Sequence, residues 1–589
     1  MIEFLQNILF TFLTLANVIG YGYFVTVFLN QNETKLSLLY LNGTILIAFT
    51  SVLINFFYPL NIYITNIFYL IFTIIGIYKI NQTLLYKHNL KLIIFILILV
   101  PIINFRSYAY ADYEIYHLPY MEILKNFKII FGLSNFSWQF GHSSIFQNIA
   151  ALQFNSLMQL DSYIYFTSIL VYILLAEVLF NYLKKEKLII KFISFIFITV
   201  FIINAKRYGS LGNDFPAHAL SFFTYILFFS LIYNHGNKND SYYFILTILI
   251  SIFGKLTLIL NIFLVIPILL FKINIFDFNF KIIIFIILIS SSFLIKNFIN
   301  TSCLFYPVNI TCFESRWSSE DYDFSDPKII SLGAKAYAYS QVLDSPKIFN
   351  DFKKIIKIED DIYSKLNNAQ KKIYERYLIQ KEYSKSKHWI KDYYDNHFKR
   401  KIVNELLLFS FLICILFYLF NRNYKFKILN NLDKNQFLRF ELFFGLIILI
   451  STIVWFVNAP LLRYGISYLY ILTSIPFLLL IKYFSQNEFR INSFFYIFII
   501  IAFIYSISNN VVRIYKFDLQ NDYTNNIVPL KKVSYKKTNI DKIDINIPLK
   551  PYELYCSFSK NLCISKANNE FLESNFKFKK IYNYILVAK

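Results

Sequence analysis

The sequence predicts an all-α polytopic membrane protein of about 13–14 spans, with a large extracytoplasmic segment and a small C-terminal α+β outer domain. Of its 589 residues, 57% are hydrophobic and 16% are charged, whereas about a quarter of the residues in a soluble domain are charged. Apolar runs of roughly 17–25 residues, the length that crosses a hydrocarbon core, recur along the chain. These runs do not alternate apolar and polar residues, so the spans are helices and not barrel strands.

The expected spans form three groups. The first lies near residues 4–28, 36–57, 61–78 and 92–105, and the second near 163–182, 189–203, 217–233, 243–253, 256–271 and 282–295. The last four lie near residues 403–420, 443–457, 464–481 and 494–507. The run at residues 2–29 is too long for a signal-peptide core and lacks a basic start, so a retained span is expected. The two runs that flank Gly254 and Lys255 could also be one broken helix.

Lysine and arginine residues in the connections between spans predict the orientation of the chain in the membrane. Basic connections at residues 79–91, 184–191, 272–281 and 422–439 are assigned to the cytoplasm. Alternation through the spans then places the N-terminus, the loops 105–161 and 204–216 and the segments 301–402 and 509–589 outside. The chain therefore divides into a transmembrane module (1–300), an extracytoplasmic segment (301–402), a four-span module (403–508) and an extracytoplasmic C-terminal domain (509–589).

The formal net charge of +22 is best explained by loop bias and attraction to anionic membrane lipids. We therefore expect membrane lipids, and no nucleic acid, as partners. On the outer side the cysteines form two close pairs, Cys303 with Cys312 and Cys556 with Cys563. An oxidising compartment favours disulfides there. A metal site is the weaker alternative, because no histidine accompanies either pair at zinc-like spacing.

The first outer loop contains a dense group of acidic, aromatic and imidazole side chains between residues 110 and 119. Pro119 favours the first turn of a short helix, which would leave Asp112, Glu114 and His117 in an irregular lead-in. Carboxylates in such a loop can meet a substrate. The alternative is that Asp112 only caps a turn. Tyr116 and, further along the loop, His142 are candidate substrate contacts.

The second outer loop places Asp214 directly before a helix that Pro216 can open, with His218 in its first turn. Asp214 either complements the helix dipole or is a second carboxylate of one site. Lys206 and Arg207 lie on the outer side against the charge rule, which indicates an anionic partner such as phosphate.

Two further cations are candidates in or near the membrane. Lys255 lies between apolar runs, where a buried ion pair, for instance with Glu177, is as good an explanation as a functional role. Arg463 begins a late span at the outer surface, where it suits a bidentate contact with a lipid phosphate. Snorkelling without function is its alternative. The sequence has no Walker loop, dinucleotide fingerprint, kinase signature or nucleophile elbow, so ATP-driven transport and serine hydrolysis lack support.

Several short stretches resemble a known class of membrane enzyme. They are residues 112–119 with Gly132-Leu133 and 140–142, Cys303 to Pro307 followed by Cys312 and Trp317, residues 459–465, and a tail with Cys556 and Cys563. Together they resemble a bacterial group placed among the GT-C type glycosyltransferases. Those enzymes are polytopic and take sugars from polyprenyl phosphates on the extracytoplasmic side. This sequence departs from several of them in having about four spans before the loop, and Asp112-Tyr-Glu114 in place of a paired acidic motif.

The resemblance implies a GT-C-like helical bundle in a bacterial inner (cytoplasmic) membrane, with a lipid-linked sugar donor as partner and a role in cell-envelope polysaccharide biosynthesis. We expect Asp112 to act as general base, with Glu114 and Asp214 as further catalytic carboxylates. The expected substrate-binding residues are Tyr116, His117, His142, Arg207, His218, Lys255 and Arg463, although hydrogen-bonded scaffolding is the favoured role for each of the three histidines. No cofactor follows from the sequence, although a divalent cation held by Asp112 and Asp214 is an alternative. The competing functions are a lipid-linked oligosaccharide flippase or other transporter, and a polysaccharide polymerase or ligase.

Overall fold

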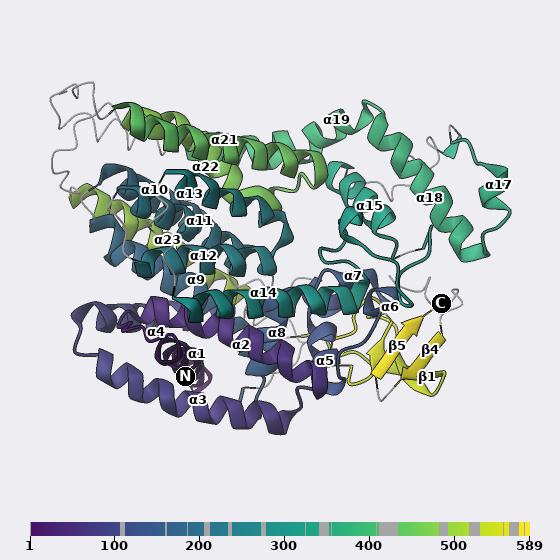
Figure 1. Cartoon of the computed structure of the whole chain (residues 1–589), viewed down its shortest axis with the longest axis horizontal. Helices are drawn as coiled ribbons and strands as arrows, with labels where there is room; N and C mark the ends of the chain where they lie inside the picture. The colour runs from purple at the N-terminus through teal and green to yellow at the C-terminus, as the bar shows by residue number, and fades with distance from the viewer. Residues whose placement is uncertain are drawn as a thin grey trace.

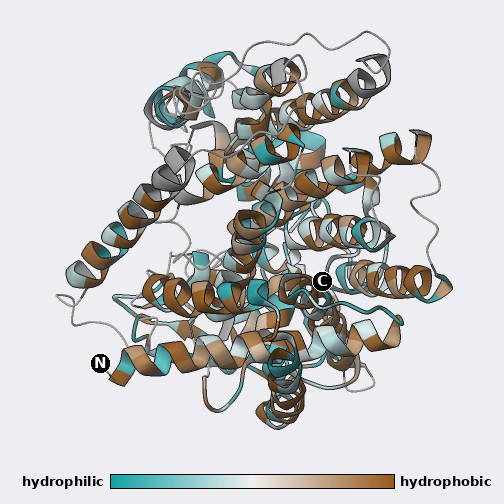
Figure 2. Ribbon diagram, turned by 90° about the vertical axis from the view of Figure 1, so that its left-hand side faces the viewer, coloured by the Kyte–Doolittle hydropathy of each residue, from teal (hydrophilic) through white to brown (hydrophobic). Residues whose placement is uncertain are grey.

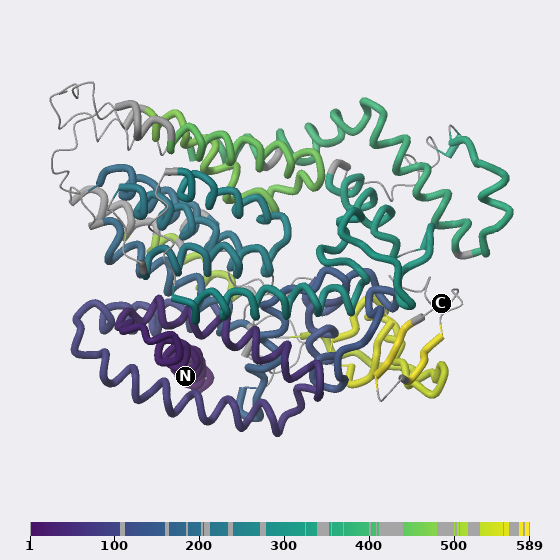
Figure 3. Tube along the Cα trace, in the orientation of Figure 1, coloured from purple at the N-terminus to yellow at the C-terminus, as the bar shows by residue number. Residues whose placement is uncertain are grey.

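The computed structural model describes most of the chain (Figure 3). The described residues are 2–105, 112–158, 162–184, 187–204, 213–233, 238–271, 279–323, 325–340, 353–354, 356–407, 409–410, 434–481, 493–517, 530–557, 559–564, 577–581 and 584–588. They form a mostly helical protein with a small C-terminal region of β-structure (Figure 1). The mostly helical class with a small C-terminal sheet region is confirmed, whereas the GT-C-like arrangement of the helices stays a prediction.

The N-terminal part holds the helices of the first two predicted span groups and the first outer loop. They are α1 (Ile2–Phe28), α2 (Leu36–Phe57), α3 (Ile62–Thr83), α4 (Lys87–Asn104), η1 (Tyr113–His117), α5 (Leu118–Asn126), α6 (Leu133–Phe136), α7 (Trp138–Gly141), α8 (Ile145–Gln153), α9 (Ser162–Phe180), η3 (Tyr182–Lys184), α10 (Leu188–Ile203), α11 (Asp214–Tyr233), α12 (Lys238–Gly254), η5 (Leu256–Leu264), α13 (Val265–Phe271) and α14 (Phe280–Thr301).

The remaining elements begin with the polar segment. They are η7 (Asn309–Thr311), α15 (Pro327–Ser340), α17 (Asp360–Tyr363), α18 (Asn368–Lys385), α19 (His388–Tyr393), η8 (Tyr394–Ile402), α21 (Lys434–Asn458), α22 (Leu462–Ile481), α23 (Ser493–Phe517), β1 (Tyr535–Ile540), β2 (Ile543–Pro548), β3 (Leu562–Cys563), β4 (Lys577–Ile581) and β5 (Tyr584–Ala588). The polar helices α15 to α19 and the strands lie together beyond one end of the long helices, on the right of Figure 1.

Among the described residues, eight helices are long and apolar enough to cross a membrane: 2–28, 36–57, 62–83, 87–104, 214–233, 280–301, 440–458 and 462–479. Shorter apolar helices cover residues 164–180, 188–201 and 256–270. The expected span at 403–420 falls largely on residues 411–433, outside the described residues, so the count of 13–14 stays a prediction. Figure 2 shows hydrophobic residues along the long helices. On α3 an apolar stripe of exposed side chains (Tyr63, Ile67, Leu70 and Ile74) is suited to face lipid.

The first three helices pack through glycines. Gly20 of α1 and Gly76 of α3 lie at one contact, where a Cβ on either glycine would stand within 1.8 Å of a backbone oxygen of the other helix. Gly22 and Gly43 make the same kind of close contact between α1 and α2. Small residues let helix backbones approach closely, which is how membrane helices gain packing without a hydrophobic driving force between them.

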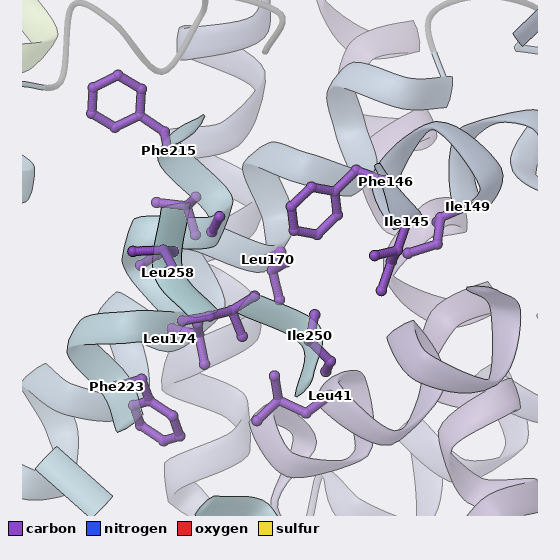
Figure 4. Packing of buried hydrophobic residues seen from close by; sticks show 14 of the residues in the cluster. Leu41, Ile145, Phe146, Ile149, Leu170, Leu174, Phe215, Phe223, Ile250 and Leu258 are labelled. Carbon is purple, nitrogen blue, oxygen red and sulfur yellow. The ribbon is translucent and has the colours of Figure 1, made fainter. Parts of the chain in front are cut away.

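One part of the hydrophobic core lies where the outer loop packs among the long helices. The short helix α8 packs among α2, α9 and α12, and its apolar side chains meet theirs (Figure 4). The labelled residues come from six elements: Leu41, Ile145, Phe146, Ile149, Leu170, Leu174, Phe215, Phe223, Ile250 and Leu258. The described part of the first outer loop is therefore folded into the helical bundle.

The C-terminal domain is a pair of small sheets in its described part. Strands β1 and β2 form an antiparallel hairpin, β3 pairs in parallel with β2, and β4 pairs with β5. The hairpin turns at Asp541 and Lys542, whose φ angles are +50° and +65°, as a tight two-residue turn requires. The elements that the structure describes between residues 530 and 588 are strands, so the helical component of the predicted α+β domain is not found there.

We predict that Gly20→Ala lowers the melting temperature of the detergent-solubilised protein. The new Cβ would collide with the Phe72 carbonyl of α3, and overpacking of this kind typically costs about 1–3 kcal/mol. Gly445→Ala is the matched control, because its Cβ would stand 3.7 Å from Ile475, at ordinary contact distance. Equal melting temperatures for the two variants would contradict the close packing of α1 and α3.

Candidate functional site

Four charged side chains from distant parts of the chain meet at one end of the helices. Lys255 Nζ lies 2.5 Å from Asp214 Oδ1, and Arg463 reaches Asp112 Oδ2 with Nη1 at 3.2 Å. Nε of Arg463 lies 3.8 Å from Asp214 Oδ2. Arg463 therefore bridges both carboxylates, and Asp214 bridges both cations. We call Asp112, Asp214, Lys255 and Arg463 the ionic cluster.

Helix ends position each member of the ionic cluster. Asp214 is the first residue of α11, where a carboxylate complements the helix dipole, and Arg463 lies in the first turn of α22. Lys255 has extended backbone angles (φ −152°, ψ 109°) between α12 and η5. Asp112 directly precedes the π-helix η1. Because each residue sits at the end of an ordered helix, the cluster is held by the bundle itself.

The Lys255 region is a hairpin tip and not one broken helix. Asn261 of η5 is hydrogen bonded with Ser221 and Tyr225 of α11, while Lys255 pairs with Asp214 at the start of α11. Thus η5 runs beside α11 in the same direction, and so returns along α12. The expected pairing of Lys255 with Glu177 is wrong. Glu177 instead accepts hydrogen bonds from Ser37 and Asn181 and pairs with His88.

Two side chains of the ionic cluster are partly exposed, and the other two are more buried. The side chains of Asp112 and Arg463 are 41% and 43% exposed, whereas those of Asp214 and Lys255 are 19% and 21% exposed. Asp112 and Arg463 can therefore meet a ligand that arrives from solution or from the membrane surface. Asp214 is suited to holding the two cations in place.

Tyr464 belongs to this site, although it was not among the residues predicted from the sequence. Arg463 Nη2 donates to its hydroxyl at 3.0 Å, and Lys255 Nζ lies 3.8 Å from its ring centroid. A cation over an aromatic face is stabilised by the ring quadrupole. The sequence signal that could have found it is its position next to Arg463 at the start of a helix.

Tyr116 and His117 are the last two residues of η1, and their rings contact each other. Their rings lie 4.2 Å apart, and Gln147 Nε2 donates to His117 Nδ1 at 2.9 Å. Burial lowers the pKa of His117 to about 4, against the opposing effect of the Asp112 carboxylate, so the imidazole is neutral near pH 7. Burial, with the negative charge of Asp112, raises the pKa of Tyr116 well above its usual range.

His218 holds helices together and does not face a substrate. Its Nδ1 accepts from Ser467, and its Nε2 donates to the carbonyl oxygen of Arg463, both at 2.9 Å. Both ring nitrogens are thus used, and the side chain is fully buried. These bonds match the scaffolding role that the sequence favours for His218, and they fix the start of α22 against α11.

Glu114 points away from the ionic cluster toward the C-terminal domain. Its buried carboxylate accepts hydrogen bonds from Ser557 Oγ and the Lys531 N–H, at 2.8 and 3.1 Å. Burial raises the pKa of Glu114, and these two bonds oppose the shift. The structure thus gives Glu114 a docking contact in place of the catalytic role expected from its neighbour Asp112.

Of the remaining candidates, His142 lies close enough to Lys255 for the lysine charge to act on its imidazole, and the others fall outside the described residues or form disulfides. His142 is exposed beside the rings of Trp138 and Tyr306 in the outer segment. Lys206 and Arg207 fall in residues 205–212, which lie outside the described residues. Both cysteine pairs form disulfides, Cys303–Cys312 and Cys556–Cys563.

A metal ion does not fit the carboxylates as they stand. Within the described ranges, no three His, Cys, Asp or Glu side chains gather closely enough to hold one. Asp112 and Asp214 are also bridged by Arg463, and a cation shared between them would have to displace this guanidinium.

The comparisons with known proteins give a family without an assigned activity. The model of a family described as a domain of unknown function (DUF8201) matches residues 1–356. Neither the curated proteins nor the solved structures gave a match. The matched stretch includes Asp112, Asp214 and Lys255, whereas Arg463 and the C-terminal domain lie beyond it.

We predict that the protein loses thermal stability as the pH falls from 7 to 5, in part because of His117. Its pKa in the folded protein (about 4) lies below the unfolded value (6.5), so the unfolded chain binds the proton more tightly in this window. The loss attributable to this residue is about 2 kcal/mol by pH 5. Melting curves of His117→Gln should show a shallower pH dependence, while the exposed His388→Gln should behave as wild type. A slope unchanged in His117→Gln would count against a buried neutral imidazole.

Proposed function

The chain belongs to the family of the domain of unknown function DUF8201, and we propose that it is a membrane glycosyltransferase. It transfers a sugar from a polyprenyl-phosphate-linked donor to a glycan, lipid or protein acceptor on the outer face of a bacterial inner membrane. The observation that carries the proposal is the ionic cluster, in which an exposed carboxylate and two cations face one place at the end of membrane helices.

Asp112 acts as the general base. Its exposed carboxylate accepts the proton of the acceptor hydroxyl as that oxygen forms a bond to the anomeric carbon. The bond between the anomeric carbon and the phosphate oxygen breaks, and its electron pair leaves with the polyprenyl phosphate. The proton remains on Asp112, which releases it to water afterwards. The leaving group is a phosphate, so the reaction needs positive charge there and no strong acid.

Arg463 and Lys255 supply that positive charge. A guanidinium matches two phosphate oxygens with parallel N–H donors, and the exposed side chain of Arg463 can exchange its bond with Asp112 for such a contact. This exchange would also free the Asp112 carboxylate for the acceptor. Asp214 keeps both cations in place, because it pairs with each of them from the less exposed side. The protonated hydroxyl of Tyr116 faces the same group of charges and is suited to bind the acceptor.

The competing functions make different demands on these residues. Transporters concentrate polar groups at mid-membrane, on broken helices. Here Lys255 occupies a hairpin tip within the ionic cluster, and Glu177 is part of a separate network with His88. A polymerase or ligase would use the same cations for the same kind of donor, and only the transferred product distinguishes it from a transferase.

We predict that Asp112→Asn abolishes most of the surface glycan in the native host while protein accumulates normally. Asparagine keeps the size and hydrogen-bonding ability of the side chain but cannot take the proton, a loss of about 10²–10⁴-fold in rate. Asp361→Asn, an exposed acid of the outer segment, is the matched control. Glycan at the wild-type level in Asp112→Asn would refute the general base.

The membrane leaflet in which the sugar donor accumulates in Asp112→Asn cells distinguishes a transferase from a flippase. In intact cells, a membrane-impermeant oxidant of sugar diols reaches lipid-linked sugar only on the outer leaflet. We expect the accumulated donor to be accessible to it. Donor that is protected until the cells are opened would show that translocation, and not transfer, has failed.

We predict that Arg463→Lys also lowers transfer, by about 10²-fold, because lysine offers a point charge in place of the planar fork. The measurement is glycan per protein in membranes from the complemented host, and Arg376→Lys in the polar segment serves as the control. Full activity in Arg463→Lys would show that the fork is not required.

A further inference from the structure

The π-helix that carries the site leaves one backbone carbonyl without a partner from the helix itself. In η1, the N–H of Leu118 bonds to the carbonyl of Tyr113, five residues earlier. The same pattern would pair the Glu114 carbonyl with residue 119. That residue is Pro119, which has no N–H to donate. A buried carbonyl without a donor is costly, so another part of the chain must supply one.

The C-terminal domain supplies it. The backbone N–H groups of Cys556 and Ser557 both donate to the Glu114 carbonyl oxygen, at 3.2 and 3.0 Å. Ser557 Oγ and the N–H of Lys531 donate to the carboxylate of the same residue. Four hydrogen bonds therefore join Glu114 to a segment that lies more than 400 residues later. Glu114 and Ser557 are both almost fully buried, so water does not replace these bonds.

A disulfide holds the donors in place. Cys563 lies in β3, which pairs with β2, and the disulfide to Cys556 ties the donor segment to this sheet. The hydroxyl of Tyr535 in β1 also donates to the Cys556 carbonyl at 2.8 Å. Ser557 has a positive φ of 27°, in the left-handed region that L-residues seldom adopt. The closed loop thus presents both N–H groups in one direction.

A second attachment of the domain is independent of this loop. Strand β5 contacts the outer loop at Phe131, which exchanges backbone hydrogen bonds with Ile585 and Val587. The hydroxyl of Tyr584 donates to the Phe56 carbonyl at the end of α2. Strand β5 would therefore stay attached to the outer loop and to α2 if the Cys556–Cys563 loop were opened.

We propose that the Cys556–Cys563 loop is a positioning element of the site, which holds η1 through Glu114 and so fixes Asp112 against Arg463. Asp112 precedes the first residue of η1, and Tyr116 and His117 are its last two. A less ordered π-helix would therefore change the positions of Asp112, Tyr116 and His117 together. π-Helical turns are rare and occur frequently at functional sites. The inference rests on the proposed function only in taking Asp112 as the reactive group.

The test is amide hydrogen exchange of the full-length protein in detergent, read in peptides that cover residues 112–118. Opening the loop with Cys556→Ser/Cys563→Ser should speed exchange there by about tenfold or more, the effect of losing one or two buried hydrogen bonds. The matched control, Cys303→Ser/Cys312→Ser, removes the other disulfide and should leave this peptide unchanged. Unchanged exchange in the Cys556 and Cys563 variant, or an equal rise throughout the chain, would overturn the proposal.

Two single substitutions keep the test decisive if the double serine variant does not fold. Ser557→Ala removes only the bond to the carboxylate and should raise exchange at residues 112–118 about two- to fivefold. Ser559→Ala is the matched control, because its hydroxyl lies in the same loop but bonds to Asn546 and not to Glu114, and it should leave this exchange unchanged. A general loss of stability would raise exchange in both variants, so unchanged exchange in Ser557→Ala, or an equal rise in Ser559→Ala, rejects the positioning role.

The exchange measurement is independent of sugar transfer. If exchange rises as expected but Asp112→Asn leaves the glycan intact, the loop holds η1 and the proposed function is wrong. If transfer depends on Asp112 but exchange does not change, only the positioning role is rejected.

Discussion

The ion pair between Asp214 and Lys255 is the interaction on which the site depends. A lysine at the tip of a helical hairpin inside a membrane bundle needs a partner, because a desolvated charge is costly. Asp214 provides it and also contacts Arg463, so one carboxylate ties the α12–η5 tip to the starts of α11 and α22. His218 also fixes the start of α22, because its Nε2 donates a hydrogen bond to the Arg463 carbonyl oxygen. The two cations are thereby held while Asp112 stays exposed.

The surrounding structure turns this ion pair into a site with fixed geometry. The glycine contacts of α1 with α2 and α3, and the burial of α8 among α2, α9 and α12, give the first outer loop a rigid base. Above it, Glu114 and Phe131 connect the same loop to the C-terminal domain. The first outer loop thus owes its position both to the long helices and to the C-terminal domain.

The sequence predicted the helical membrane class and placed Asp112, Asp214, Lys255 and Arg463 among its candidates, because hydropathy and out-of-place charges are local signals. It did not predict their pairing. Lys255 was matched with Glu177 on charge alone, although the alternation of spans puts the end of α9 on the side opposite the α12–η5 tip. The partners of Glu114 and Tyr464 could not be predicted because tertiary contacts set them, and Ser557 lies far along the chain from Glu114.

Binding of polyprenyl phosphate to the purified protein would test whether the ionic cluster is a phosphate site. This measurement needs neither the sugar nor the acceptor. Native mass spectrometry can count lipid retained by wild type, Arg463→Met and Asp112→Asn. We expect wild type and Asp112→Asn to retain the lipid and Arg463→Met to bind it about tenfold more weakly or worse, because a charged hydrogen-bonding partner is lost. Equal retention by Arg463→Met and wild type, or none by wild type, would contradict a phosphate site at the ionic cluster.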